Sequence, residues 1–181
     1  IKVNFDKEKI VNLFRNNDIN YTDLKSDPFL VISSYNTNFI NIGLDKKNSL
    51  NNFLESKVNK INKLINYFFP NLDPNDRYIL PYEKIITEDK KAFNEILDKY
   101  NLNQLIYINI SKLDIQNQVD ISLKIFDNDG FQKVGNLELN DSNFENLDKF
   151  FYYLSDEILY YMAEWWKNSY QINNSKFNIM V

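Results

Sequence analysis

This chain of 181 residues contains no histidine and no cysteine, and that absence restricts its chemistry. Serine–histidine–aspartate and cysteine–histidine catalysis, the usual zinc sites, iron–sulfur clusters and disulfides all need one of these residues. A formal net charge of −4 disfavours nucleic acid as a partner, because a phosphate backbone repels an acidic surface. Hydrophobic residues make up 44% of the chain, which is enough to bury a core.

The first part of the chain reads as strand, helix and strand. Alternating residues over 1–5 predict a half-buried strand, and Asp6 can cap a helix that ends near Asp18. The apolar run Phe29–Ile32 follows a turn and is typical of a buried central strand. Residues 33–47 are expected to form an irregular hairpin. Its expected anchors are Phe39, Ile42 and Leu44.

A long amphipathic helix is predicted next. From position 48 or 49 to Phe68, apolar residues recur at three- and four-residue steps, and Pro70 ends the pattern. Residues 77–81 predict a short strand closed by proline. A further helix is expected from position 87 or 88 to about position 100.

The second half of the chain predicts three or four more strands and one long helix. Residues 105–110 form an apolar run that is typical of a central strand, while 118–126 and 131–139 alternate as the arms of a hairpin. A closing helix is expected from position 141 or 142 to about 170, and residues 176–181 could begin another strand.

These segments together predict a single α/β domain of the α+β type over residues 1–181. We expect a layered sandwich in which a mixed sheet of about five to six strands packs against about four helices. No stretch approaches 18 consecutive apolar residues, so no integral membrane span is expected. Because the chain opens on Ile1 in what reads as a strand, we expect a fragment of a longer protein.

The segment Asp127–Gly130 carries the strongest hairpin signal of the chain. It also resembles the start of a calcium-binding loop, with Glu138 at the twelfth position, but Phe131 and Gln132 occupy the fifth and sixth positions, where a ligand and a glycine are required. We therefore predict a β-turn there. No metal site and no cofactor are expected. The three glycines form no phosphate-binding fingerprint, which excludes nucleotide-dependent enzymes of the Walker and dinucleotide-binding types.

The closing helix carries more apolar surface than one buried face needs. One stripe is expected in the core: Phe144, Leu147, Phe151, Leu154, Ile158, Tyr161, Met162 and Trp165. A second set consists of Phe150, Tyr153, Tyr160 and Trp166, with Tyr152 beside it. Either the helix is buried between two layers, or this second set is a docking surface.

Two charged groups indicate other kinds of site. Glu83, Glu88 and Asp89 follow Pro81, and with nearby carboxylates such as Asp73 and Asp76 they could bind a hard cation or act as an acid/base pair. Loop and cap carboxylates are the alternative. Lysines at three-residue spacing could face anionic lipid headgroups, although a solvated helix face is the alternative. These lysines are Lys57, Lys60 and Lys63.

The order of the apolar segments resembles a bacterial family of exported proteins, the domain of unknown function family twenty sixty-six. The resemblance includes Pro28 before Phe29–Ile32, the segment Tyr78–Pro81 followed by Glu83, and the helix, strand, hairpin and closing helix over 88–168. At the start of the chain it involves Ile1, Val3, Phe5, Ile10, Phe14 and Ile19. It implies a fragment of a longer exported protein, a periplasmic or envelope-associated location, and no established activity.

Two functions are compatible with these features. The first is a non-catalytic module on the envelope side that binds a protein partner through the closing helix or an open sheet edge. The alternative is a carboxylate-based hydrolase or a cation-dependent binder of a small ligand. A membrane-surface module that uses the three lysines is a third reading.

Overall fold

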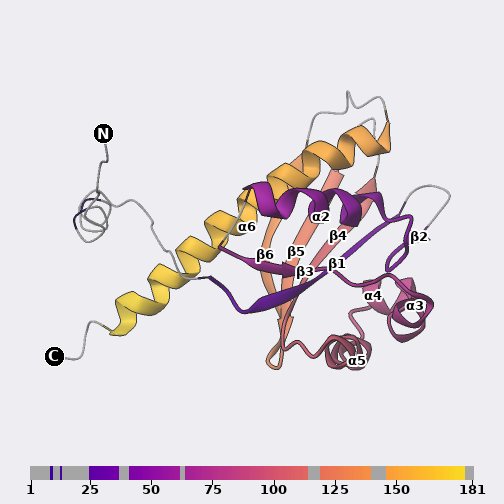
Figure 1. Ribbon diagram of the computed structural model, residues 1–181, viewed down its shortest axis with the longest axis horizontal. Helices are drawn as coiled ribbons and strands as arrows, with labels where there is room; N and C mark the ends of the chain where they lie inside the picture. Colours follow the sequence, from indigo (N-terminus) through magenta and orange to yellow (C-terminus); the bar gives the residue numbers. More distant parts are fainter. Residues whose placement is uncertain are drawn as a thin grey trace, which may run out of the picture.

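Six strands form one mixed sheet at the centre of the computed structural model (Figure 1). The structure describes residues 9, 13, 25–36, 41–61, 64–113, 119–139 and 146–177. The strands are β1 (Pro28–Asn36), β2 (Asn41–Ile42), β3 (Asn66–Phe68), β4 (Leu105–Leu113), β5 (Val119–Asp127) and β6 (Gly130–Leu139). Their order is β2-β1-β4-β5-β6, and β3 also pairs with β1. Strands β1, β3 and β4 run parallel, whereas β4, β5 and β6 form an antiparallel meander.

Helices lie on both faces of the sheet, as Figure 1 shows. The described residues form five of them: α2 (Ser49–Ile61), α3 (Pro74–Ile79), α4 (Tyr82–Ile86), α5 (Lys90–Tyr100) and α6 (Leu147–Phe177). Helices α2 and α6 pack against one face, and α3, α4 and α5 pack against the other. The predicted mixed α/β layered fold is therefore confirmed.

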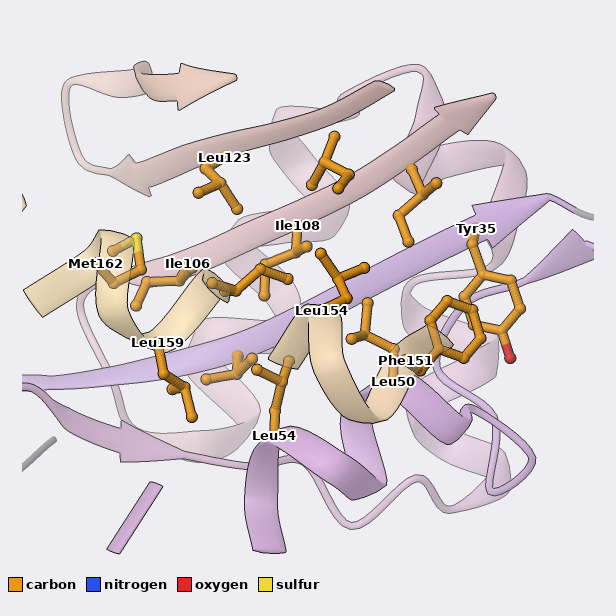
Figure 2. Close-up of a cluster of buried hydrophobic side chains, with 14 of the residues drawn as sticks. Tyr35, Leu50, Leu54, Ile106, Ile108, Leu123, Phe151, Leu154, Leu159 and Met162 are labelled. Atoms are coloured by element: carbon orange, nitrogen blue, oxygen red, sulfur yellow. The ribbon is translucent and has the colours of Figure 1, made fainter. Parts of the chain in front are cut away.

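Strand β1 contributes to a core on each side of the sheet. Its alternate residues Phe29 and Val31 face α2 and α6, while Leu30 and Ile32 face α3 to α5, and all four are buried. This agrees with the prediction of a central strand. The first core contains Phe151, Leu154, Leu159 and Met162 of α6 together with Ile106, Ile108 and Leu123 of the sheet, and Figure 2 shows Phe151 beside Tyr35 of β1.

The predicted helix from position 48 or 49 to Phe68 is too long. Helix α2 ends at Ile61, and Asn66–Phe68 is strand β3, which pairs in parallel with Pro28–Leu30. The hydroxyl of Ser26 accepts a hydrogen bond from the Asn66 amide at 2.9 Å and helps to fix this register. The apolar spacing of a short segment does not distinguish helix from strand, and the pairing with β1 decides here.

The predicted strand over 77–81 is wrong, because these residues follow a helix start that the sequence signals locally. Asp73 caps α3, Pro74 lies in its first turn, and Asp73 and Asp76 form a reciprocal capping box. Residues 82–86 form α4, which the sequence pattern did not predict. The expected helix that ends near Tyr100 is present as α5.

The remaining predictions mostly agree with the structure. Strand β4 and the β5–β6 hairpin are confirmed, as is the helical closing segment. Ile42 and Leu44 are buried as expected. Lys176 and Phe177 belong to α6 and not to a strand. The predicted strand over 1–5 lies outside the described residues, as do Phe39, Phe144, residues 178–181 and all of the predicted first helix except Lys9 and Leu13.

Tyr161 of α6 lies over Gly135 of β6. A Cβ atom at this position would lie 1.9 Å from the Tyr161 hydroxyl oxygen. We therefore expect Gly135→Ala to lower the free energy of unfolding by about 1–3 kcal/mol, the usual cost of overpacking. Urea unfolding of Gly135→Ala, Tyr161→Ala and the double variant tests the cause. A cost of Gly135→Ala that persists undiminished in the Tyr161→Ala background would contradict it.

Candidate interaction surface

Helix α6 divides into a buried side and an exposed side. The buried side carries Phe151, Leu154, Ile158, Leu159 and Met162. On the exposed side three tyrosines keep about half or more of their surface in contact with solvent: Tyr152 is 48% exposed, Tyr153 49% and Tyr160 64%. We call the side of α6 that carries Tyr153 and Tyr160 the tyrosine face. Tyr153 and Tyr160 are seven residues apart, so they lie on the same side of the helix, about two turns from each other.

Phe150 does not belong to this exposed side, although its helical spacing groups it with Tyr153 and Tyr160 in the sequence. It is only 2% exposed and packs in the core, with its ring centroid 5.4 Å from that of Phe151. Trp166 is partly buried against the same core and stacks at a tilt on Trp165. Because α6 packs against α2 as well as the sheet, its buried sector is wider than one stripe, and Leu159 is buried in it too.

Tyr152 is held at the junction between α6 and α2. The ammonium group of Lys57 lies 3.4 Å from the centroid of the Tyr152 ring. It also donates hydrogen bonds to the Tyr152 main-chain oxygen and, at 2.7 Å, to the Asp156 carboxylate. Phe53 of α2 contacts the same ring edge to face. These contacts fix Tyr152, so we assign it mainly to helix packing and Tyr153 and Tyr160 to the surface.

The contacts of Lys57 also correct the predicted basic cluster. Lys57 is 6% exposed and neutralised by Asp156, so it is not available to lipid headgroups. The sequence spacing placed it on the polar side of α2, but the neighbouring helix α6 covers that side. The side chain of Lys60 and the whole of Lys63 lie outside the described residues.

The acidic residues after Pro81 have separate local contacts. Glu83 is exposed on α4, Glu88 forms an ion pair with Lys124 of β5, and Asp89 caps α5 by accepting a hydrogen bond from the Ala92 amide at 3.1 Å. Glu88 also has a positive φ of 53° between α4 and α5. In the part of the chain that the structure describes, no three acidic residues lie close enough together to hold a metal ion.

Asp76, which the sequence analysis groups with the acidic residues near Pro81, is a buried carboxylate between α3 and α5. Asp76 is fully buried and accepts hydrogen bonds from Lys99 at 2.6 Å and from the Tyr100 hydroxyl at 2.8 and 2.9 Å. Burial raises the pKa of Tyr100 to about 12, so this hydroxyl stays a donor at neutral pH. All of these groups are paired with one another, which indicates a structural role. The Asp-Pro-x-Asp spacing of the α3 capping box was the available signal.

The turn between β5 and β6 is the predicted β-turn. Gly130 has a φ of 104°, and the Asp127 carboxylate accepts a hydrogen bond from the Asp129 amide at 2.9 Å. The second carboxylate oxygen of Asp127 accepts from Gln132 at 3.3 Å. The carboxylate therefore stabilises its own turn.

Two further findings bear on the assignment of function. Of the helices that the structure describes, none is both long and apolar enough to cross a bilayer. Comparison with known proteins finds no match to this chain among family models, curated proteins or solved structures.

Proposed function

We propose that this chain is a non-catalytic protein-binding module and that the tyrosine face of α6 is its contact surface. The observation that carries the proposal is the exposure of Tyr153 and Tyr160 on a helix whose opposite side is buried in the core. Tyrosine is enriched in protein interfaces because its ring buries a large apolar area while its hydroxyl can still hydrogen-bond.

The surroundings of the tyrosines fit an interface of this kind. Glu157 lies between Tyr153 and Tyr160 in sequence and is exposed, as is Lys149 one turn before Tyr153. Aromatic anchors surrounded by charged residues are the usual arrangement of a binding hot spot and its polar rim. The helix also continues beyond the sheet, as the yellow part of α6 in Figure 1 shows.

The envelope-side location is part of the proposal and is supported by the family resemblance of the apolar segments. A carboxylate-based hydrolase or cation-dependent binder receives less support from the geometry. Glu88 is neutralised by Lys124, and Asp89 is engaged in a helix cap.

A site-specific photo-crosslinker tests the proposal in the cells that produce the protein. One variant carries the crosslinking residue in place of Tyr160. The matched control carries it in place of Tyr78, which is 84% exposed on α3 and lies on the opposite side of the sheet. We expect a discrete crosslinked species from position 160 and none of the same mass from position 78, because only the first position lies on the tyrosine face.

Two outcomes would contradict the proposal. One is identical crosslinking from both positions, which would mean that any exposed position crosslinks. The other is a complete lack of crosslinks at position 160 while the protein is folded and abundant.

A further inference from the structure

Helix α6 holds a cation of the neighbouring helix α2 between a tyrosine and an acid that are four residues apart. The ammonium group of Lys57 lies 3.4 Å from the centroid of the Tyr152 ring and 2.7 Å from a carboxylate oxygen of Asp156. Residues four positions apart lie one above the other on the same side of a helix, so their ring and carboxylate can contact one cation together. The pair Tyr152–Asp156 is therefore a receptor for a basic side chain.

The same spacing recurs one residue further along the helix. Tyr153 and Glu157 are again a tyrosine and an acid four residues apart, and both are exposed. A step of one residue turns the helix by about 100°, which moves this second pair away from the α2 contact and toward solvent. Tyr160 follows Glu157 by three residues on the same side of the helix. An aromatic ring therefore lies about one turn before the Glu157 carboxylate and another about one turn after it.

Glu157 lacks the counterion that the other acids of this part of α6 have. Asp156 pairs with Lys57, and the carboxylate of Glu164 pairs with Lys167 at 2.6 Å. Within the ranges that the structure describes, the Glu157 carboxylate takes part in neither an ion pair nor a hydrogen bond. The tyrosine face thus presents one negative charge that is not neutralised within the described structure, and this charge lies between its two tyrosines.

We propose that the pair Tyr153–Glu157 receives a lysine or arginine side chain of the partner protein, in the way that Tyr152–Asp156 receives Lys57. This inference rests on the proposed function and specifies the partner, whose contact surface carries a basic residue at its centre. The carboxylate accepts a charge-assisted hydrogen bond from the cation, and the ring of Tyr153 contacts the cation and its apolar stem. A second copy of this chain fits less well, because each copy carries a net charge of −4 and two acidic surfaces repel each other.

Charge variants of the photo-crosslinking chain test this proposal. The chain with the crosslinking residue in place of Tyr160 also carries Glu157→Gln, Glu157→Lys or, as the matched control, Glu83→Gln, which removes the same charge from an exposed site on α4. We expect the yield of the crosslinked species to fall about fivefold or more with Glu157→Gln and further with Glu157→Lys. The control should crosslink normally. Glutamine and glutamate have similar helix propensities and Glu157 is exposed, so the midpoint of urea unfolding should not change with Glu157→Gln.

A charge exchange with the partner identifies the contact itself. Mass spectrometry of the crosslinked species should place the attachment within a few residues of a lysine or arginine. Replacing that basic residue with glutamate should abolish crosslinking, and Glu157→Lys should restore it.

The failures of this inference and of the proposed function are distinguishable. Crosslinking at position 160 that persists unchanged with Glu157→Lys would overturn the basic contact and leave the tyrosine face as a binding surface. A crosslinked species made of two copies of this chain would also overturn it. No crosslinking at position 160 even with Glu157 unchanged would contradict the proposed function and this inference together.

Discussion

Replacing Asp76 with alanine is expected to lower the free energy of unfolding by about 3–5 kcal/mol, which would be among the largest effects of any single change. The carboxylate is fully buried between α3 and α5, where it accepts hydrogen bonds from Lys99 and from the Tyr100 hydroxyl. Its removal would leave a partly buried ammonium and a hydroxyl without their main partner. Urea unfolding followed by circular dichroism measures the loss.

Asp73 provides the matched control for this prediction. It belongs to the same capping box and also contacts Lys99, at 3.0 Å, but its side chain is partly exposed. Asp73→Ala should therefore cost clearly less than Asp76→Ala. Equal losses would mean that the capping box, and not the burial of Asp76, determines the stability of this region.

The pH dependence of this cluster has a definite sign. Burial by itself lowers the pKa of Lys99, but hydrogen bonds to Asp76 and Asp73 outweigh it and raise this pKa above its ordinary value of 10.5. The hydrogen bond from Lys99 lowers the pKa of Asp73 below 3.8. Lys99 therefore contributes fully to the free energy of unfolding below pH 10.5, and this contribution is lost as the pH rises further. The contribution of Asp73 is lost as the pH falls below 3.8. The stability difference from Lys99→Met should be constant between these values and shrink outside them.

Phe150→Ala is expected to cost about 3–5 kcal/mol of unfolding free energy, as the loss of a buried phenylalanine usually does. Phe150 is buried beside Phe151 in the core between the sheet, α2 and α6. The neighbouring exposed side of the same helix should behave differently. Tyr160→Ala should change the free energy of unfolding by no more than about 0.5 kcal/mol.

Thermal and urea unfolding of the two variants side by side measures this contrast. A small loss of unfolding free energy from Phe150→Ala would show that Phe150 lies on the surface, as the sequence pattern predicts for the second set of aromatic residues. A large cost for Tyr160→Ala would show that the tyrosine face is packed against another part of the chain, and it would remove the main support for a docking role.

The strands whose sequences show a continuous apolar run or a long apolar/polar alternation could be predicted. The apolar run Phe29–Ile32 is buried on both faces of the sheet, and the alternation around Asp127–Gly130 matches the β5–β6 hairpin. Short segments could not be predicted reliably, because their structure depends on distant partners. Asn66–Phe68 is a strand since it pairs with β1, and Arg77–Ile79 is helical since Asp73 and Pro74 start α3 just before it.

The candidate surface was only partly predictable, for a related reason. Helical spacing distinguishes one side of α6 from the other, but it does not reveal that α2 covers part of the polar side. That second contact buries Phe150 and Lys57 and leaves Tyr153 and Tyr160 exposed. The same limit applies to Glu88, whose ion pair with Lys124 joins residues 36 positions apart in the chain.

The affinity of this chain for the partner identified by crosslinking tests most directly whether the tyrosine face binds that partner. Isothermal titration calorimetry would compare the unchanged chain, the Tyr153→Ser/Tyr160→Ser double variant and the Tyr78→Ser control. We predict that the double variant binds at least tenfold more weakly, a loss of about 1.4 kcal/mol or more, while its free energy of unfolding stays within about 1 kcal/mol of the unchanged chain. The control should bind normally. Equal affinity of all three proteins would contradict a role for these tyrosines in binding.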